Sequence, residues 1–279
     1  MGTKQPLRSA RPTLHFWGVR GSIPTPGTMT SKFGGNTACV EFRYGPDRVI
    51  FDAGTGLREL GQSLGQASNL ELTVLLSHYH WDHLLGLPFF TPIFKPDTVL
   101  NIFGESKEGG GPRDALMRQF TAPSFPVEFS TLPSKLNFFD VKPGDAFAVG
   151  GIKVTVGRLN HPNAAICYRA QAGKASVVYA SDHEHDGQGD RGLIDFCAGA
   201  SALVYDAMYS NSSYSTKKGW GHSTWEEAVR IAKAAKVKKL FLYHHDPLND
   251  DKAMAKIDRA AKKAFAGAIV ARERLVVPL

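Results

Sequence analysis

Leu75-Leu76-Ser77-His78-Tyr79-His80-Trp81-Asp82-His83 carries three histidines and one aspartate in its last six residues. The run in front of it, residues 70–76, is apolar, of strand length and contains β-branched members, which is typical of a buried strand. His78 and His80 alternate with Tyr79, so an extended backbone would project both imidazoles to one side. Asp82 and His83 follow where the chain turns. Surface histidines in a polar loop are the alternative, but the buried strand in front favours a site for two divalent metal ions, with zinc as the first expectation.

Three later segments repeat the arrangement of a strand that ends in a metal-binding side chain. They are residues 152–160 before His161, residues 176–181 before Asp182, and residues 239–243 before His244. This order of ligands resembles the metallo-β-lactamase superfamily over nearly the whole chain. The resemblance implies an α/β fold, a four-layer αββα sandwich of two mixed β-sheets with helices outside.

The resemblance also assigns the ligands of two divalent ions, Zn²⁺ or Mn²⁺. It implies that His78, His80 and His161 hold one ion, that Asp82, His83 and His244 hold the other, and that Asp182 bridges them. In the superfamily, the aspartate of a D-x-G-x-G corner supports the metal-binding loop, and this chain has that corner at Asp52.

Length and composition set the outer bounds. The chain has 279 residues, 43% of them hydrophobic, and a formal net charge of +7, which permits an anionic substrate. Its three cysteines form no C-x-x-C pair, and no apolar run reaches membrane-spanning length, so we expect a cytoplasmic protein without a membrane partner.

We expect a disordered tail at 1–12 and a single domain at 13–279. The Gly/Pro/Phe-rich insertion at 105–133 is a lid, an oligomer contact or a surface excursion.

Two metal ions indicate hydrolysis but do not identify the type of bond that is hydrolysed. A second motif narrows the possible substrate classes. Residues 204–209 contain a strand that ends in an acid, Asp206, and His222 stands at the mouth of a helix that Ser223 or Thr224 would cap. This arrangement resembles the phosphodiesterase branch of the superfamily, which includes RNase Z and the phosphoribosyl cyclic phosphodiesterases. The resemblance implies attack by a hydroxide held between the ions, with His222 as general acid or phosphate contact and Asp206 orienting it. The candidate catalytic residues are therefore Asp82, His222 and Asp206.

The length between two ligands bears on the substrate. RNase Z carries a long tRNA-binding arm between the lone histidine and the bridging aspartate, whereas only 20 residues lie between His161 and Asp182 here. We therefore expect a small cyclic or nucleotide-like phosphodiester rather than a long RNA. Alternatives are tRNA 3′-end processing, hydrolysis of a carboxylic ester, lactone or lactam, and a binding module without turnover. Superfamily relatives are often dimers, so a homodimer is a further expectation.

Several polar residues remain open at this point. His183, Glu184 and His185 are surplus to the ligand pattern and are either loop residues or a further site. Arg20, Asn36 and Thr37 lie in Gly-rich corners and are weaker candidates for contact with phosphate or sugar.

Overall fold

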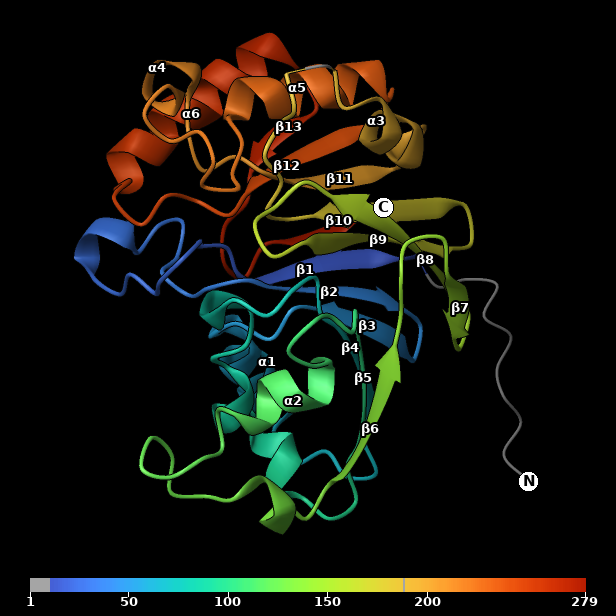
Figure 1. Ribbon diagram of the computed structural model, residues 1–279. Coiled ribbons are helices and arrows are strands. Elements are labelled where there is room, and N and C mark those ends of the chain that lie inside the picture. The colour runs from blue at the N-terminus through green and yellow to red at the C-terminus, as the bar shows by residue number, and fades with distance from the viewer. Residues whose placement is uncertain (1–10, 188) are drawn as a thin grey trace.

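The computed structural model describes residues 11–187 and 189–279, which form two seven-stranded sheets packed face to face (Figure 1). The first sheet comprises, in spatial order, β14 (Val276–Pro278), β1 (Thr13–Gly18), β2 (Cys39–Tyr44), β3 (Asp47–Phe51), β4 (Glu71–Leu75), β5 (Val99–Gly104) and β6 (Lys135–Asp140). The second comprises β13 (Ala268–Val270), β12 (Lys239–Tyr243), β11 (Ala202–Asp206), β10 (Ala175–Ala180), β9 (Ala165–Ala172), β8 (Ile152–Leu159) and β7 (Ala146–Val149). Each sheet is mixed, with one antiparallel half and one parallel half.

Helices cover both outer faces and complete the four expected layers. On the first sheet lie α1 (Gly56–Leu64) and α2 (Pro112–Met117), and on the second lie α3 (Arg191–Cys197), α5 (Trp225–Ala234) and α6 (Asp251–Ala264), as Figure 1 shows. The short α4 (Asn211–Tyr214) and 3-10 turns at Thr28–Thr30, Trp81–His83, Leu87–Phe89, Thr91–Phe94 and Phe129–Thr131 occupy connections. The αββα sandwich predicted from the sequence is confirmed.

The core is divided as these layers require. One buried cluster lies between the sheets and contains Phe16, Phe51, Tyr179 and Phe241, contributed by strands of both. A second fills the space under α5 and α6, and a third lies under α1 and α2. Burial of apolar surface on both faces of each sheet therefore fixes the strand ends in space.

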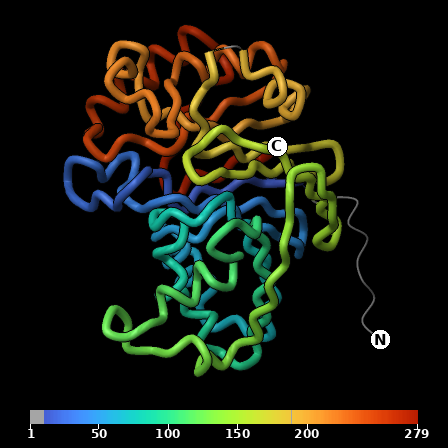
Figure 2. Tube along the Cα trace, in the orientation of Figure 1, coloured from blue at the N-terminus to red at the C-terminus, as the bar shows by residue number. Residues whose placement is uncertain are grey.

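The topology brings the candidate residues to one edge. Strands β10, β11 and β12 are parallel, and β8 runs in their direction because two antiparallel pairings separate it from β10. In the first sheet, β3 and β4 are also parallel. The residues that follow the carboxyl ends of these strands meet across the sandwich. Figure 2 traces the chain through both halves of the molecule.

The ends of the chain differ from expectation. Near the C-terminus the chain turns at Arg274, which has φ of 61°, and the last strand begins at Val276. Strand β13 was not predicted. The expected tail at 1–12 falls mainly on residues 1–10, outside the described residues, while the Pro12 carbonyl accepts a hydrogen bond from the Leu279 amide at 2.9 Å. Among the helices of the described residues, none has both the length and the apolar character needed to cross a bilayer.

Candidate metal centre

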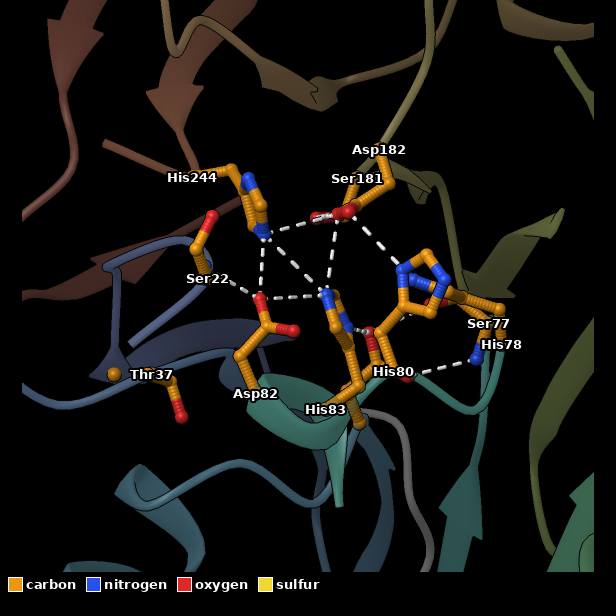
Figure 3. A network of polar contacts seen from close by, with 12 residues as sticks. Ser22, Thr37, Ser77, His78, His80, Asp82, His83, Ser181, Asp182 and His244 are labelled. Atoms are coloured by element: carbon orange, nitrogen blue, oxygen red, sulfur yellow. Dashed lines mark hydrogen bonds and ion pairs between the residues drawn. The ribbon is translucent and has the colours of Figure 1, made fainter. Parts of the chain in front are cut away.

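All seven predicted ligands lie together at the shared edge of the two sheets. Figure 3 labels six of them, all except His161. They form two groups whose ligand atoms lie within 4.8 Å of one another, namely His78, His80, His161 and Asp182, and Asp82, His83, Asp182 and His244. Asp182 is common to both groups. Its Oδ1 lies 3.2 Å from Nε2 of His83, whereas its Oδ2 lies 3.6 Å from Nε2 of His78. The carboxylate therefore presents one oxygen to each group, as a bridging ligand must.

The second group has the spacing that a divalent ion requires. Nε2 of His83 lies 3.3 Å from Nε2 of His244, and Nε2 of His244 lies 3.0 Å from Oδ2 of Asp82. Zinc binds nitrogen and oxygen at about 2.0–2.1 Å, which separates neighbouring ligands of a tetrahedron by about 3.3 Å. The observed distances therefore fit ligands that converge on one ion.

The first group is similarly arranged. Nε2 of His161 lies 3.2 Å from Nδ1 of His80. Nε2 of His78 is buried and has no hydrogen-bond partner among the described residues. Burial, together with the charge of His83, holds the pKa of His78 well below its usual value, and burial with His161 lowers the pKa of His80 to about 4. These imidazoles are neutral near pH 7 and keep the lone pairs that a metal needs.

Backbone conformation at the strand ends aims several of these side chains. Asp52 after β3, Asp182 after β10 and His244 after β12 have φ of 60°, 56° and 56°. The left-handed region costs a residue with a side chain about 1–2 kcal/mol. The surrounding contacts must offset that cost, which indicates that the direction of these side chains is favoured over an unstrained backbone.

Asp52 supports the metal-binding loop, as its D-x-G-x-G corner suggested. Its buried carboxylate accepts from the backbone N and the Oγ of Ser77 at 2.7 and 2.8 Å, and from the Tyr179 hydroxyl at 2.8 Å. It also lies 2.7 Å from Nδ1 of His83. With Nδ1 bonded to Asp52, His83 presents Nε2 to the ligand cluster.

His222 and Asp206 form a pair beside the cluster. Nδ1 of His222 lies 2.8 Å from Oδ2 of Asp206, and its ring stacks on that of His244 with centroids 5.0 Å apart. Burial opposes protonation, but the Asp206 carboxylate raises the pKa of His222 to about 9. Cations bound by Asp82 and Asp182 would reduce this shift, because they would neutralise two carboxylates that contribute to it.

The helix behind His222 begins as one of the two predicted caps requires. The Thr224 side chain accepts from the Glu227 amide at 3.2 Å and caps α5. Ser223 instead is fully buried and contacts Nδ1 of His185 at 3.0 Å. The capped helix fixes the backbone that follows His222.

The weaker candidates in the Gly-rich corners are structural. Arg20 is fully buried and donates to the carbonyls of Gly34, Asp246 and Asn249 at 2.7–3.0 Å. Thr37 is also fully buried, and the Asn36 side chain donates to Glu273 at 3.1 Å. These hydrogen bonds join neighbouring loops, and contact of the three residues with phosphate or sugar stays a prediction.

Two contacts that the sequence pattern did not reveal come from the backbone. The Gly221 carbonyl lies 2.7 Å from Nδ1 of His161, and the Ser22 amide donates to Oδ2 of Asp82 at 2.8 Å. A glycine in a G-x-G-H run was the available signal for the first contact. A Cβ at Gly221 would lie 2.2 Å from Nδ1 of His161, so only glycine fits there.

A cavity of about 620 Å³ opens beside the first group of ligands. It is bordered by His78, His80, Trp81, Lys107, Arg118 and Gln119. Trp81 is 77% exposed. Part of the predicted insertion at 105–133 therefore forms a wall of a cavity that reaches the candidate metal centre.

Comparison with known proteins places this site in a family. Residues 47–245 match the family described as Beta-lactamase superfamily domain. Ribonuclease Z from Thermoplasma volcanium is 25% identical over 279 aligned positions, covering 83% of this chain and 86% of the relative. Ribonuclease Z from Pyrococcus horikoshii is 26% identical and covers 83% and 85%. The metallo-beta-lactamase fold protein YhfI from Bacillus subtilis superposes with a TM-score of 0.72 at 21% identity, over 96% of this chain and 99% of that one. Because the family match spans most of the sequence, the chain belongs to the beta-lactamase superfamily, with the metallo-β-lactamase fold that its ligand order predicted.

Proposed function

We propose that this protein hydrolyses phosphodiester bonds with two divalent metal ions, Zn²⁺ or Mn²⁺, and that its substrate is a small cyclic or nucleotide-like diester. The observation that carries the proposal is the His222–Asp206 pair, whose Nδ1 and Oδ2 lie 2.8 Å apart beside the ligand cluster. The relatives named Ribonuclease Z support the phosphodiester class.

The proposed chemistry divides between the ions and the chain. Ions held by the seven ligands would supply a water of lowered pKa and neutralise charge on the phosphoryl oxygens. Asp206 accepts the Nδ1 proton of His222, which leaves Nε2 to hold the phosphate or to give a proton to the leaving oxygen. Such proton donation contributes about 10²–10⁴-fold to a rate, because an alkoxide leaves more readily when it is protonated.

The cavity beside the centre supports a small substrate. Its volume of about 620 Å³ lies within the range of small-molecule sites. Lys107 and Arg118 place positive charge along its wall, and the exposed indole of Trp81 offers a face on which a nucleobase could stack. Between His161 and Asp182 the chain is taken up by the antiparallel pair β9–β10, which leaves little length for a tRNA-binding arm.

Processing of tRNA 3′ ends is the second candidate, because the named relatives align over 83% of this chain. A panel of 2′,3′-cyclic, 3′,5′-cyclic and linear dinucleotide diesters, with a precursor tRNA, assayed on the metal-reconstituted protein distinguishes the two. We expect turnover of small diesters that a chelator abolishes. Cleavage of the precursor tRNA alone would replace the small-substrate proposal with the second candidate. Size measurement in solution tests the expected homodimer.

The role of His222 has its own test. His222→Ala should lower kcat on bis(p-nitrophenyl) phosphate by about 10²–10⁴-fold with metal content unchanged. His15→Ala, on β1 and away from the ligands, is the control. An unchanged rate in His222→Ala would refute the assigned role, and turnover of lactones or lactams instead of diesters would refute the phosphodiester class.

A further inference from the structure

The residues directly after the bridging aspartate all join loops of the candidate centre. His183 Nε2 lies 2.9 Å from Oδ1 of Asp190, and its Nδ1 accepts from the Asn160 amide at 3.2 Å. His185 contacts Ser223 and packs its ring on that of Tyr214, with centroids 4.3 Å apart. Among the described residues, the two groups of predicted metal ligands, and a third cluster of Asp206, His222 and His244, do not include His183, Glu184 or His185. The surplus polar residues are therefore used as loop contacts.

Glu184 has the contacts with the most direct bearing on the centre. Its Oε1 accepts from the Gly219 amide at 2.6 Å and from the Tyr214 hydroxyl at 3.0 Å, and its Oε2 accepts from the Gly221 amide at 2.8 Å. Gly219 and Gly221 have φ of 83° and 86°. The carboxylate thus holds both ends of a glycine turn that has little conformational preference of its own.

The turn held by Glu184 sets two functional groups at once. The Gly221 amide binds Glu184, while the carbonyl of the same residue lies 2.7 Å from Nδ1 of His161. His222 is the next residue and pairs with Asp206. Movement of this turn would therefore rotate His161, a ligand of the first group, and shift the imidazole proposed to act on the leaving oxygen.

We propose that Glu184 is a positioning residue, which ties the turn at 219–221 to the loop after Asp182 and so orients His161 for metal binding and His222 for catalysis. It does not touch the cluster itself. The part that concerns His222 rests on the proposed function, whereas the part that concerns His161 rests only on the metal centre.

Glu184→Gln is the sharpest variant, because it keeps the shape of the side chain. The amide of Gln has one acceptor oxygen, and its NH₂ group would face one of the two backbone N–H groups that the carboxylate binds. The turn therefore loses one hydrogen bond to residue 184. We expect the Zn²⁺ affinity of the metal-stripped protein, measured by competition with a chromophoric chelator, to fall about 10–100-fold, as is usual when a group that orients a metal ligand is lost. At saturating metal, kcat on bis(p-nitrophenyl) phosphate should fall while KM changes little.

Two further variants make the result decisive. Glu226→Gln is the matched control, because Glu226 accepts the Asn211 amide at 3.1 Å in the same region without contacting the turn. Tyr214→Phe removes one donor to Glu184 and should give a smaller loss of Zn²⁺ affinity, which tests the tie even when Glu184→Gln does not fold.

Equal Zn²⁺ affinity in wild type, Glu184→Gln and Tyr214→Phe, or an equal loss in Glu226→Gln, would overturn the proposal. The affinity measurement does not depend on turnover, so a failure of the proposed phosphodiesterase activity would be seen separately.

Discussion

Replacement of Asp52 by Asn tests how the fold controls the metal centre. Asn tolerates the left-handed φ of 60° at this position, so the backbone can keep its conformation. The carboxylate accepts hydrogen bonds from the Ser77 amide and from the Ser77 and Tyr179 hydroxyls, and it lies against Nδ1 of His83. The hydroxyls can rotate to accept from an NH₂ group. An N–H on Nδ1 of His83 cannot remain opposite such a group.

The energetic cost follows from the protonation of His83. In the metal-free protein, burial opposes its charge, but Asp82, Asp182 and Asp52 raise its pKa well above the usual value. Breaking a buried pair of this kind costs about 3–5 kcal/mol, so Asp52→Asn should lower the free energy of unfolding by about 3 kcal/mol after the hydroxyls adjust. Asn would also favour the tautomer with the proton on Nε2, which removes the lone pair that faces His244 and Asp82. We expect metal affinity to fall about 10–100-fold.

Urea denaturation of the metal-free protein and a zinc titration measure these two effects, and nitrogen NMR of His83 reports the tautomer. Asp97→Asn is the control, because that half-buried carboxylate, away from the cluster, also accepts a hydrogen bond from a backbone amide, that of Asn69, at 2.7 Å. Stability and metal affinity equal to wild type in Asp52→Asn would refute the reasoning, as would an equal loss in the control.

Three further outcomes follow from the geometry. Gly221→Ala should lower the free energy of unfolding by about 1–2 kcal/mol because of the positive φ, and it should weaken zinc binding about 10–100-fold because the new Cβ meets His161. In the same denaturation and titration assays, Gly199→Ala, which has φ of 66° and open space around it, should lose stability only. The pKa of His222 is raised to about 9 from 6.5, so its protonation stabilises the metal-free protein fully below pH 6.5, and this stabilisation of about 3 kcal/mol is lost as the pH rises through 9. Urea denaturation at pH 6 and pH 9.5 should show a smaller change in stability for His222→Asn than for wild type, and an identical change in both proteins would contradict the reasoning. Zinc at about a thousand times its Kd should raise the free energy of unfolding by about 4 kcal/mol per ion, which thermal unfolding with and without chelator measures. No rise in the unfolding temperature with zinc, or the same rise in Asp182→Asn, would speak against a shared bridging ligand.

The clustering of the seven predicted ligands could be anticipated from the sequence because their order resembles that of the metallo-β-lactamase superfamily and because His78, His161, Asp182 and His244 come at or just after the carboxyl end of an apolar strand. Such strands read clearly as buried runs, and the sheet order brings their ends together. His161, Asp182 and His244 could therefore be assigned although more than 80 positions separate the first from the last. Asp206 and His222 were suggested by the resemblance to the phosphodiesterase branch, at a strand end and a helix start, and the structure brings them within 2.8 Å of each other.

Contacts made through the backbone could not be predicted. The Gly221 carbonyl and the Ser22 amide reach the centre only through tertiary folding, and any residue type has such groups. The carbonyl contacts of Arg20 could not be predicted either, since a guanidinium suits phosphate and carbonyl oxygens equally and its burial is known only from the fold. The short strand β13 carries too few residues for its alternation to be recognised.

The division of the ligands between the two sheets has a consequence for biogenesis. His78, His80, Asp82 and His83 follow β4, whereas His161, Asp182 and His244 follow strands of the other sheet, and β14 at the far end of the chain completes the sheet that contains β4. A nascent polypeptide that has emerged only through β6 holds four ligands but no bridging aspartate, and lacks the edge strand of its own sheet. Under the proposed ligand assignment, the complete pair of metal sites would therefore form only after residue 244 has been synthesised and the two sheets have packed against each other.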